Sequence, residues 1–154
     1  MTPDQIRRAV AKLQTTSVVA EDEAWSILRP LGMEVIPYLL EAYPTFGKWQ
    51  GRVSLVFHSV RYARVSEEAY DLGLLAIRDR ATLVRYRACG LLAYSLRRDA
   101  IPHLESLLGH SDQRTSEDAS AAIDAIRHQN HHFFRDREHT GQIHWVVNDA
   151  DRAA

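Results

Sequence analysis

The sequence predicts an all-α protein, built as an α-solenoid of about four helical hairpins. The first observation is a phrase that occurs twice: Gly32–Tyr43 reads GMEVIPYLLEAY, and Asp99–Gly109 reads DAIPHLESLLG. The two Ile-Pro pairs are 65 residues apart, which is two periods of about 32 to 33 residues, in the range of helical-hairpin repeats. The second observation is a series of apolar stripes at helical spacing, joined by short connectors, with no strand pattern before residue 130.

The first half of the chain is expected to form four helices. Thr2 is an N-cap before Pro3, and Gln5 completes a capping box. Residues 15–17 end this helix, and a second runs from about residue 20 to a stop at Gly32. The four apolar stripes are Ile6–Leu13, Ala24–Leu31, Ile36–Tyr43 and Val53–Val60, the last of which includes Phe57.

The second half of the repeat region is expected to form four more helices. Ser66 caps the fifth, and the sixth has the clearest stripe, from Val84 to Leu96. Asp99 is expected to cap the seventh, and Thr115 with Asp118 fits a capping box that opens the eighth. Because each stripe covers only one face of its helix, every hairpin needs a neighbour that buries it.

The helical pattern stops after Asn130, so we divide the chain into a repeat domain, 1–130, and a tail, 131–154. Thr140-Gly141 looks like a turn, and residues 134–137 and 143–147 could flank it as a short β-hairpin. The alternative is an extended cap, held against the last helices by Phe133, Phe134 and Trp145.

Composition restricts the classes of function. A chain of 154 residues with 45% hydrophobic and 25% charged residues is typical of one globular domain. No apolar run reaches the length of about 20 residues that a membrane span needs, and the N-terminus does not have the pattern of a signal peptide. The single cysteine, Cys89, excludes an internal disulfide and favours a reducing cytoplasm. The net charge of −1 argues against non-specific nucleic-acid binding.

Charge is unevenly distributed along the chain. Residues 61–98 contain eight arginines and four acids, whereas residues 99–154 contain ten acids and five arginines. A basic middle beside an acidic end could steer a charged partner. The alternative is a solvated helical surface of mixed sign.

Several residues resemble the pattern of HEAT-like repeats. The first matching feature is Ile-Pro near the start of a first helix, at Ile36-Pro37 and Ile101-Pro102. The second is an aspartate in the turn, at Asp79 and Asp112, and the third is Val-Arg at the start of the second helix, at Val84-Arg85. The resemblance covers about residues 32–130. It departs from the pattern in the middle repeat, which has no proline, and in the last, where Thr115-Ser116 replaces Val-Arg. It implies a curved scaffold and no catalytic residues.

The resemblance also implies which residues face a partner. In HEAT-like stacks the second helices line the concave face, and the tail would extend this surface with residue types that dominate binding hot spots. The expected partner-binding residues are Arg52, Arg61, Tyr62, Arg85, Tyr94, Asp124 and Arg127 on the helices, with Arg135, Arg137 and Trp145 on the tail.

The tail resembles the C-terminal stretches of small helical immunity proteins, which neutralise bacterial toxins. The residues that carry this resemblance are Asp136–His139 and Trp145–Asn148. It implies a cytoplasmic protein that binds a cognate toxin and occludes its active site. One alternative is an adaptor or subunit that binds a protein other than a toxin. Another is a relative of the helical-repeat DNA glycosylases, whose basic face would be formed by Arg78, Arg80, Arg85, Arg87, Arg97 and Arg98.

Patterns that would indicate catalysis or a cofactor are weak. Cys89 lies in ACGLLA, a context typical of an inert core thiol. His128 and His132 would share a helix face, at a spacing usable for zinc, if the last helix extended that far, but histidines near a helix C-terminus are also favoured by the helix dipole. We therefore expect no enzyme activity, no metal and no cofactor, and a protein as the partner.

Overall fold

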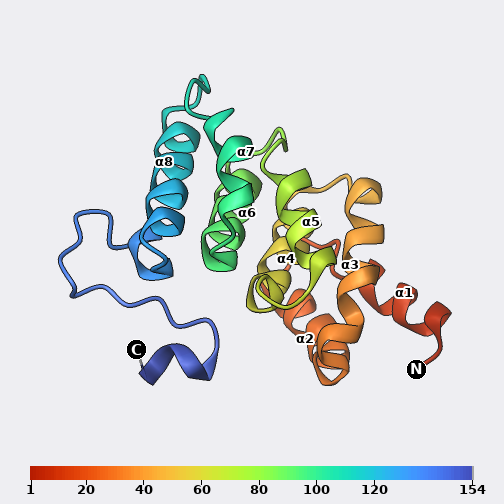
Figure 1. The fold of residues 1–154 in the computed structure, drawn as a ribbon. Coiled ribbons are helices and arrows are strands. Elements are labelled where there is room, and N and C mark those ends of the chain that lie inside the picture. Colours follow the sequence, from red (N-terminus) through yellow and green to blue (C-terminus); the bar gives the residue numbers. More distant parts are fainter. Residues whose placement is uncertain (154) are drawn as a thin grey trace.

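The computed structural model describes residues 1–153 and confirms the all-α class (Figure 1). No residue in this range is in a β-strand. The α-helices are α1 (Pro3–Ala11), α2 (Val18–Leu28), α3 (Ile36–Ala42), α4 (Trp49–Ser59), α5 (Glu67–Ala76), α6 (Thr82–Ser95), α7 (Ile101–Glu105) and α8 (Gln113–Arg127). Short 3-10 helices connect or follow them: η1 (Arg29–Val35), η2 (Tyr43–Thr45), η3 (Val60–Tyr62), η4 (Arg98–Ala100), η5 (His131–Phe134) and η6 (Asp149–Ala153). No helix among the described residues is long and apolar enough to span a bilayer.

Side-chain caps explain where three helices begin. Thr2 and Gln5 form the expected capping box of α1, Ser17 accepts the Ala20 N–H at the start of α2, and Ser66 accepts the Ala69 N–H at the start of α5. Each side chain satisfies a backbone donor that the helix itself leaves unpaired.

Two predicted caps are wrong. Asp99 lies inside η4 and accepts hydrogen bonds from Tyr70 and Arg97 instead of capping α7. The N-cap of α8 is Asp112 rather than Thr115, which lies within the first turn of the helix. In both places the side chain accepts a hydrogen bond from a distant residue, Asp99 from Tyr70 and Thr115 from Arg85.

The helices form two rows in which each element contacts the next. Helices α1, α3 and α5 contact one another in order, and α4, α6 and α8 do the same (Figure 1). Each odd-numbered helix also packs against the even-numbered helix that follows it. The buried apolar residues form one continuous cluster, which extends from Ile6 in α1 to Phe134 in η5.

Helix α5 approaches α6 closely at Gly73. A Cβ atom at this position would lie 2.6 Å from Cδ2 of Leu91 and 3.0 Å from Cδ2 of Leu92, both in α6. A side chain at position 73 would therefore require the two leucine side chains to shift, and glycine avoids this strain where α5 packs on α6. Cys89 is fully buried in the same region, and burial raises the pKa of its thiol.

Two ion pairs repeat along the even-numbered helices, and we call them the Arg–Asp ladder. Arg52 of α4 donates from Nε and Nη2 to the carboxylate of Asp79, at 2.7 and 3.1 Å. Arg85 of α6 donates from Nη2 to Asp112 at 3.1 Å. The partners are 27 residues apart in both pairs, and each aspartate lies in or at the end of the next hairpin's turn. These turns lie along the upper edge of the molecule in Figure 1.

The ladder corrects the expectation that Arg52 and Arg85 contact a partner. Both side chains are only about 5% exposed and their guanidinium groups are already paired. In the Arg52–Asp79 pair both side chains are about 5% exposed, and removing one member of such a buried pair leaves an uncompensated charge, which typically costs about 3–5 kcal/mol. These arginines therefore join neighbouring hairpins.

The tail contains no strand between residues 131 and 153, so the expected β-hairpin is not formed. Asn130 caps η5 by accepting the His132 N–H. The Asp136 carboxylate then accepts hydrogen bonds from the Thr140 N–H and hydroxyl and from the Gly141 N–H. This carboxylate organises the turn at Thr140-Gly141, and an extended segment leads from it to η6 at the lower edge of the molecule (Figure 1).

Candidate partner-binding groove

A cavity of about 470 Å³ opens between the second helices and the tail, and we call it the groove. Helices α2, α4 and α6 form one side of it, η1 and η3 contribute residues at its edge, and the tail closes the other side. Its lining consists of Glu21, Asp22, Trp25, Arg29, Phe57, His58, Val60, Arg61, Tyr86, Arg87, Gly90, Phe134, Arg135, Trp145, Val146 and Val147.

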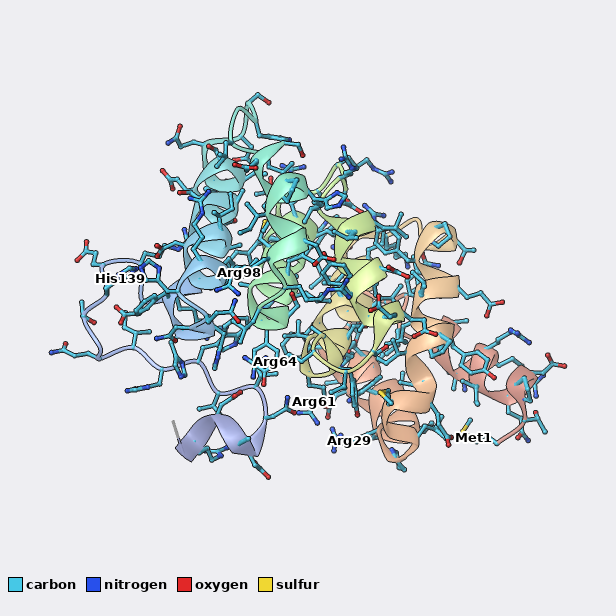
Figure 2. The ribbon with its side chains drawn as sticks, in the orientation of Figure 1. Met1, Arg29, Arg61, Arg64, Arg98 and His139 are labelled. Carbon is cyan, nitrogen blue, oxygen red and sulfur yellow. The ribbon has the colours of Figure 1, made fainter. Side chains whose placement is uncertain are left out.

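Four guanidinium groups surround the groove: Arg29, Arg61, Arg87 and Arg135, the arginine rim. Figure 2 shows Arg29 and Arg61 along one edge of the molecule. No side chain of the rim forms an ion pair or a hydrogen bond with another residue of the described range 1–153. The guanidinium groups of the rim are therefore not held in internal ion pairs, although Glu21 and Asp22 also line the groove.

Arg87 is the most unusual member of the rim because it is half-buried without an acidic partner. Its Cζ atom lies 5.0 Å from the centre of the Phe57 ring and 5.6 Å from that of Tyr86. Burial lowers the pKa of this guanidinium, and the positive charge of Arg135 lowers it further. Arg87 and Arg135 face the same space, and Arg87 is partly desolvated. An anion that entered this space would stabilise the charged form of both guanidinium groups.

Aromatic and imidazole rings of α2 and α4 also line the groove. The Trp25 and His58 rings are stacked, with centroids 3.7 Å apart and an interplanar angle of 8°. His58 Nε2 lies 2.6 Å from Oε1 of Glu21, and Ser54 donates to the same oxygen at 2.8 Å. Burial lowers the pKa of His58, although Glu21 opposes this effect. Glu21 is thus occupied by two internal contacts.

The same contacts do not create a nucleophile. Ser54 and His58 both bind the carboxylate of Glu21, so the serine hydroxyl donates to Glu21 and not to the imidazole. An activated serine would need its hydroxyl hydrogen-bonded to the base. This arrangement holds Trp25 and His58 in place and suits a binding surface.

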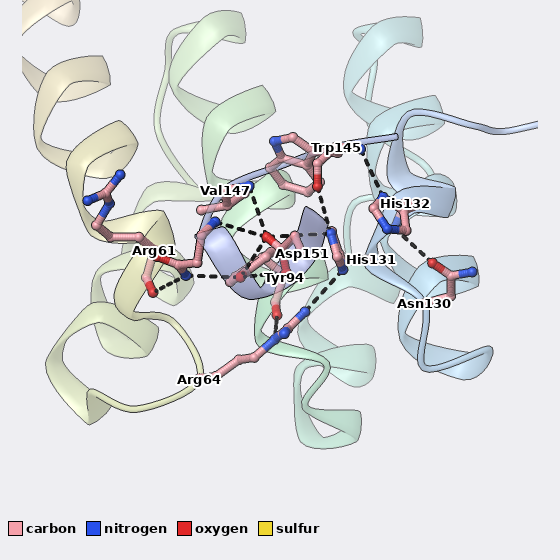
Figure 3. A network of polar contacts seen from close by, with 10 residues as sticks. Arg61, Arg64, Tyr94, Asn130, His131, His132, Trp145, Val147 and Asp151 are labelled. Atoms are coloured by element: carbon pink, nitrogen blue, oxygen red, sulfur yellow. Dashed lines mark hydrogen bonds and ion pairs between the residues drawn. The ribbon is translucent and has the colours of Figure 1, made fainter. Parts of the chain in front are cut away.

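Two histidines of η5 hold the later part of the tail in place (Figure 3). His131 Nε2 lies 2.7 Å from the carbonyl oxygen of Trp145, and its Nδ1 lies 3.2 Å from Nη2 of Arg64. A carbonyl only accepts and a guanidinium only donates, so the His131 ring is neutral with its proton on Nε2. His132 Nδ1 accepts the Trp145 N–H at 2.8 Å and is therefore also unprotonated.

Asp151 fixes the far end of the same segment (Figure 3). Its Oδ2 accepts the N–H groups of Val147 and Asn148, each at 2.9 Å, and the Tyr94 hydroxyl at 3.0 Å. The Asn148 side chain donates in turn to the Arg61 carbonyl and the Tyr94 hydroxyl, both at 3.0 Å. This network sets the position of Trp145 beside the groove before any partner arrives.

Burial alone would raise the pKa of Asp151, but the backbone hydrogen bonds from Asn148 and Val147 outweigh it and hold the pKa below its ordinary value. Burial lowers the pKa of both His131 and His132. The attachment therefore requires an ionised aspartate and two neutral imidazoles.

Apart from Arg52 and Arg85, which belong to the ladder, the predicted partner-binding residues fall into three groups. Arg61, Arg135 and Trp145 converge on the groove. Asp124, Arg127 and Arg137 line a different surface, around α7 and α8. Tyr62 packs against the core, and Tyr94 is about 2% exposed, which corrects the expectation that its side chain contacts a partner.

Sequence reasoning missed several groove residues. Trp25 and Arg29 were not selected, and Arg87 was considered only for the nucleic-acid alternative. Phe57 was assigned to the core, yet its side chain is 51% exposed at the groove. A large aromatic residue beside the apolar stripe of α4 was the available signal.

The condition for a metal pair at His128 and His132, that the last helix extends to both residues, is not met. Helix α8 ends at Arg127, so His128 and His132 do not share a helix face. His132 binds the Trp145 N–H, while His128 lies beside Asp124 and His139.

No protein-family model matches the sequence, and a search of curated proteins finds no significant match.

Proposed function

We propose that the chain is a protein-binding scaffold of HEAT-like repeats, and that its groove receives an acidic segment of another protein. The observation that carries this proposal is Arg87, a half-buried guanidinium that faces Arg135 without an acidic partner among the described residues. A carboxylate from a partner would offset the desolvation of Arg87 and the repulsion between the two cations. Arginine and exposed aromatic residues are also the types enriched at binding hot spots.

The recurring Arg–Asp ladder supports the solenoid part of the proposal. In a solenoid each repeat contacts only its neighbours, so equivalent contacts are expected between successive repeats. The two ion pairs of the ladder are equivalent contacts of this kind. A rigid support also reduces the entropy that a partner's binding would cost.

The most specific form of the proposal is a bacterial immunity protein that occludes the active site of a cognate toxin. The resemblance of residues 136–139 and 145–148 to such proteins is what favours it. An adaptor that binds a different acidic protein would use the same groove. The nucleic-acid alternative is less favoured, because the net charge of the chain is −1 and non-specific nucleic-acid binding needs a basic surface.

The test begins with co-purification of the protein from its native cells, followed by identification of the partner and measurement of the dissociation constant with purified components. Arg87→Glu and Arg135→Glu are expected to weaken binding by about tenfold or more each. The matched control is Arg8→Glu, since Arg8 is exposed on α1 and does not line the groove.

Equal affinity of all three variants would overturn the assignment of the groove. If the partner is an enzyme whose activity the wild-type protein abolishes and Arg87→Glu does not, the immunity form gains support. A partner without such activity would favour the adaptor. Tighter binding to a nucleic acid than to any protein would refute both.

A further inference from the structure

Three side chains with metal-ligating groups meet at the end of α8. Asp124 and His128 lie one helical turn apart, and His139 approaches from the tail. One ligand atom from each residue lies within 4.8 Å of the other two. His139 Nε2 is 2.5 Å from Oδ2 of Asp124, and His128 Nδ1 is 3.2 Å from Oδ1 of the same carboxylate.

The position of His139 is fixed by its surroundings. Its ring stacks on Phe133, with centroids 3.8 Å apart and an interplanar angle of 10°. Its backbone has a φ of 55°, a left-handed conformation that costs free energy in a residue other than glycine. The Asp136 carboxylate, which accepts hydrogen bonds from Thr140 and Gly141, holds the loop in this shape. The imidazole is thereby aimed at α8 before any ligand binds.

Two imidazoles and one carboxylate are a donor set that suits divalent transition metals, and zinc commonly takes three protein ligands with water in the open position. The three side chains here are between about one third and one half exposed, so the open side faces solvent. Charges around them are balanced, since Arg127 and Arg137 line the same surface as Glu105 and Glu117.

We propose that Asp124, His128 and His139 bind a divalent transition metal ion, for which Zn²⁺ is the best match. Binding exchanges the contact of His128 Nδ1 with the Asp124 carbonyl oxygen, now 2.9 Å, for coordination. It draws the two imidazole nitrogens and the carboxylate toward one ion, at about 2.0–2.2 Å each. The ion then joins the loop at residues 136–141 to α8. This site is separate from the groove and does not depend on the groove's occupant.

The test is a titration of metal-free, untagged protein with Zn²⁺ near neutral pH, followed by calorimetry and by thermal unfolding. We expect one equivalent to bind and to raise the unfolding midpoint, because a ligand that binds only the folded state stabilises it. Co²⁺ should give the visible absorption of a nitrogen- and oxygen-ligated ion. His139→Ala and His128→Ala should each weaken Zn²⁺ binding by at least about tenfold.

The matched control is His103→Ala, since His103 is an exposed histidine on α7 outside the cluster. It should bind Zn²⁺ with wild-type affinity. Saturation at less than one equivalent in the wild type, or equal affinity in His139→Ala and the control, would overturn the proposal. Circular dichroism of each variant verifies that the helices are intact, so a loss of binding can be assigned to the lost ligand.

Discussion

Replacing Asp151 with asparagine should release the tail without unfolding the helices. Oδ2 of Asp151 accepts three hydrogen bonds, from two backbone N–H groups and from Tyr94. The side chain is about 5% exposed, so water screens these bonds little. Asparagine has nearly the same shape and one acceptor oxygen, and it can keep the bonds without the negative charge.

The size of the effect follows from that lost charge. Hydrogen bonds to a charged group contribute about 1.5–3 kcal/mol, compared with about 1 kcal/mol for neutral pairs. Three bonds that each lose about 0.5–1 kcal/mol give a loss of about 2 kcal/mol for local opening of the tail. This corresponds to a rise of about 30-fold in the population of the open tail.

Amide hydrogen exchange measures that population directly. The N–H groups of Val147 and Asn148 should exchange about 30-fold faster in Asp151→Asn, whereas amides in α6 should keep their wild-type rates. The control is Asp149→Asn, because Asp149 is fully exposed and its ion pair with Arg152 is at the surface. Equal exchange at Val147 in both variants would show that the carboxylate of Asp151 does not hold the tail.

Three further predictions concern pH, packing and thiol reactivity. Burial lowers the pKa of His131 and His132, so these side chains take up protons at a higher pH in the unfolded chain than in the folded protein. Their contribution to stability is therefore complete above about pH 6.5 and is lost as the pH falls toward their folded pKa values. After correction for the intrinsic pH dependence of exchange, the protection of the Trp145 amide should therefore decrease as the pH falls below about 6.5, and a flat profile would contradict this reasoning. Gly73→Ala should lower the free energy of unfolding in urea by about 1–2 kcal/mol, because overpacking outweighs the gain in helix propensity. The control is Gly109→Ala, whose Cβ would meet nothing within 4 Å and should be close to neutral. Cys89 should resist alkylation in the native protein and react at once in denaturant; rapid native labelling would show that the core around α6 opens.

The sequence predicted well those features that depend on neighbouring residues. The capping box at Thr2 and the cap at Ser66 involve contacts within three positions, so local pattern was sufficient. Thr140-Gly141 was also identified as a turn from its own residues. What the pattern could not show was that Asp136 would organise this turn without flanking strands.

Features that depend on distant partners were missed. Asp99 does not cap α7, because its carboxylate accepts hydrogen bonds from Tyr70 and Arg97. Arg52 was assigned to a partner-binding face because the resemblance to HEAT-like repeats places the second helices there, and only the position of Asp79 in the next hairpin explains its burial. The groove combines three helices with the tail, so its membership could not be read from the periodicity of any single helix.

The Arg–Asp ladder also determines how the molecule can deform. It fastens the hairpins along one edge, at the turns, whereas the tail fastens the opposite edge through Asp151 (Figure 1). When the tail detaches, the helices can move apart only at that opposite edge, because the ion pairs of the ladder keep the turns together. Salt screens exposed charges strongly and buried charges little. High ionic strength should therefore weaken the attraction of the arginine rim for a partner and leave the ion pairs of the Arg–Asp ladder intact.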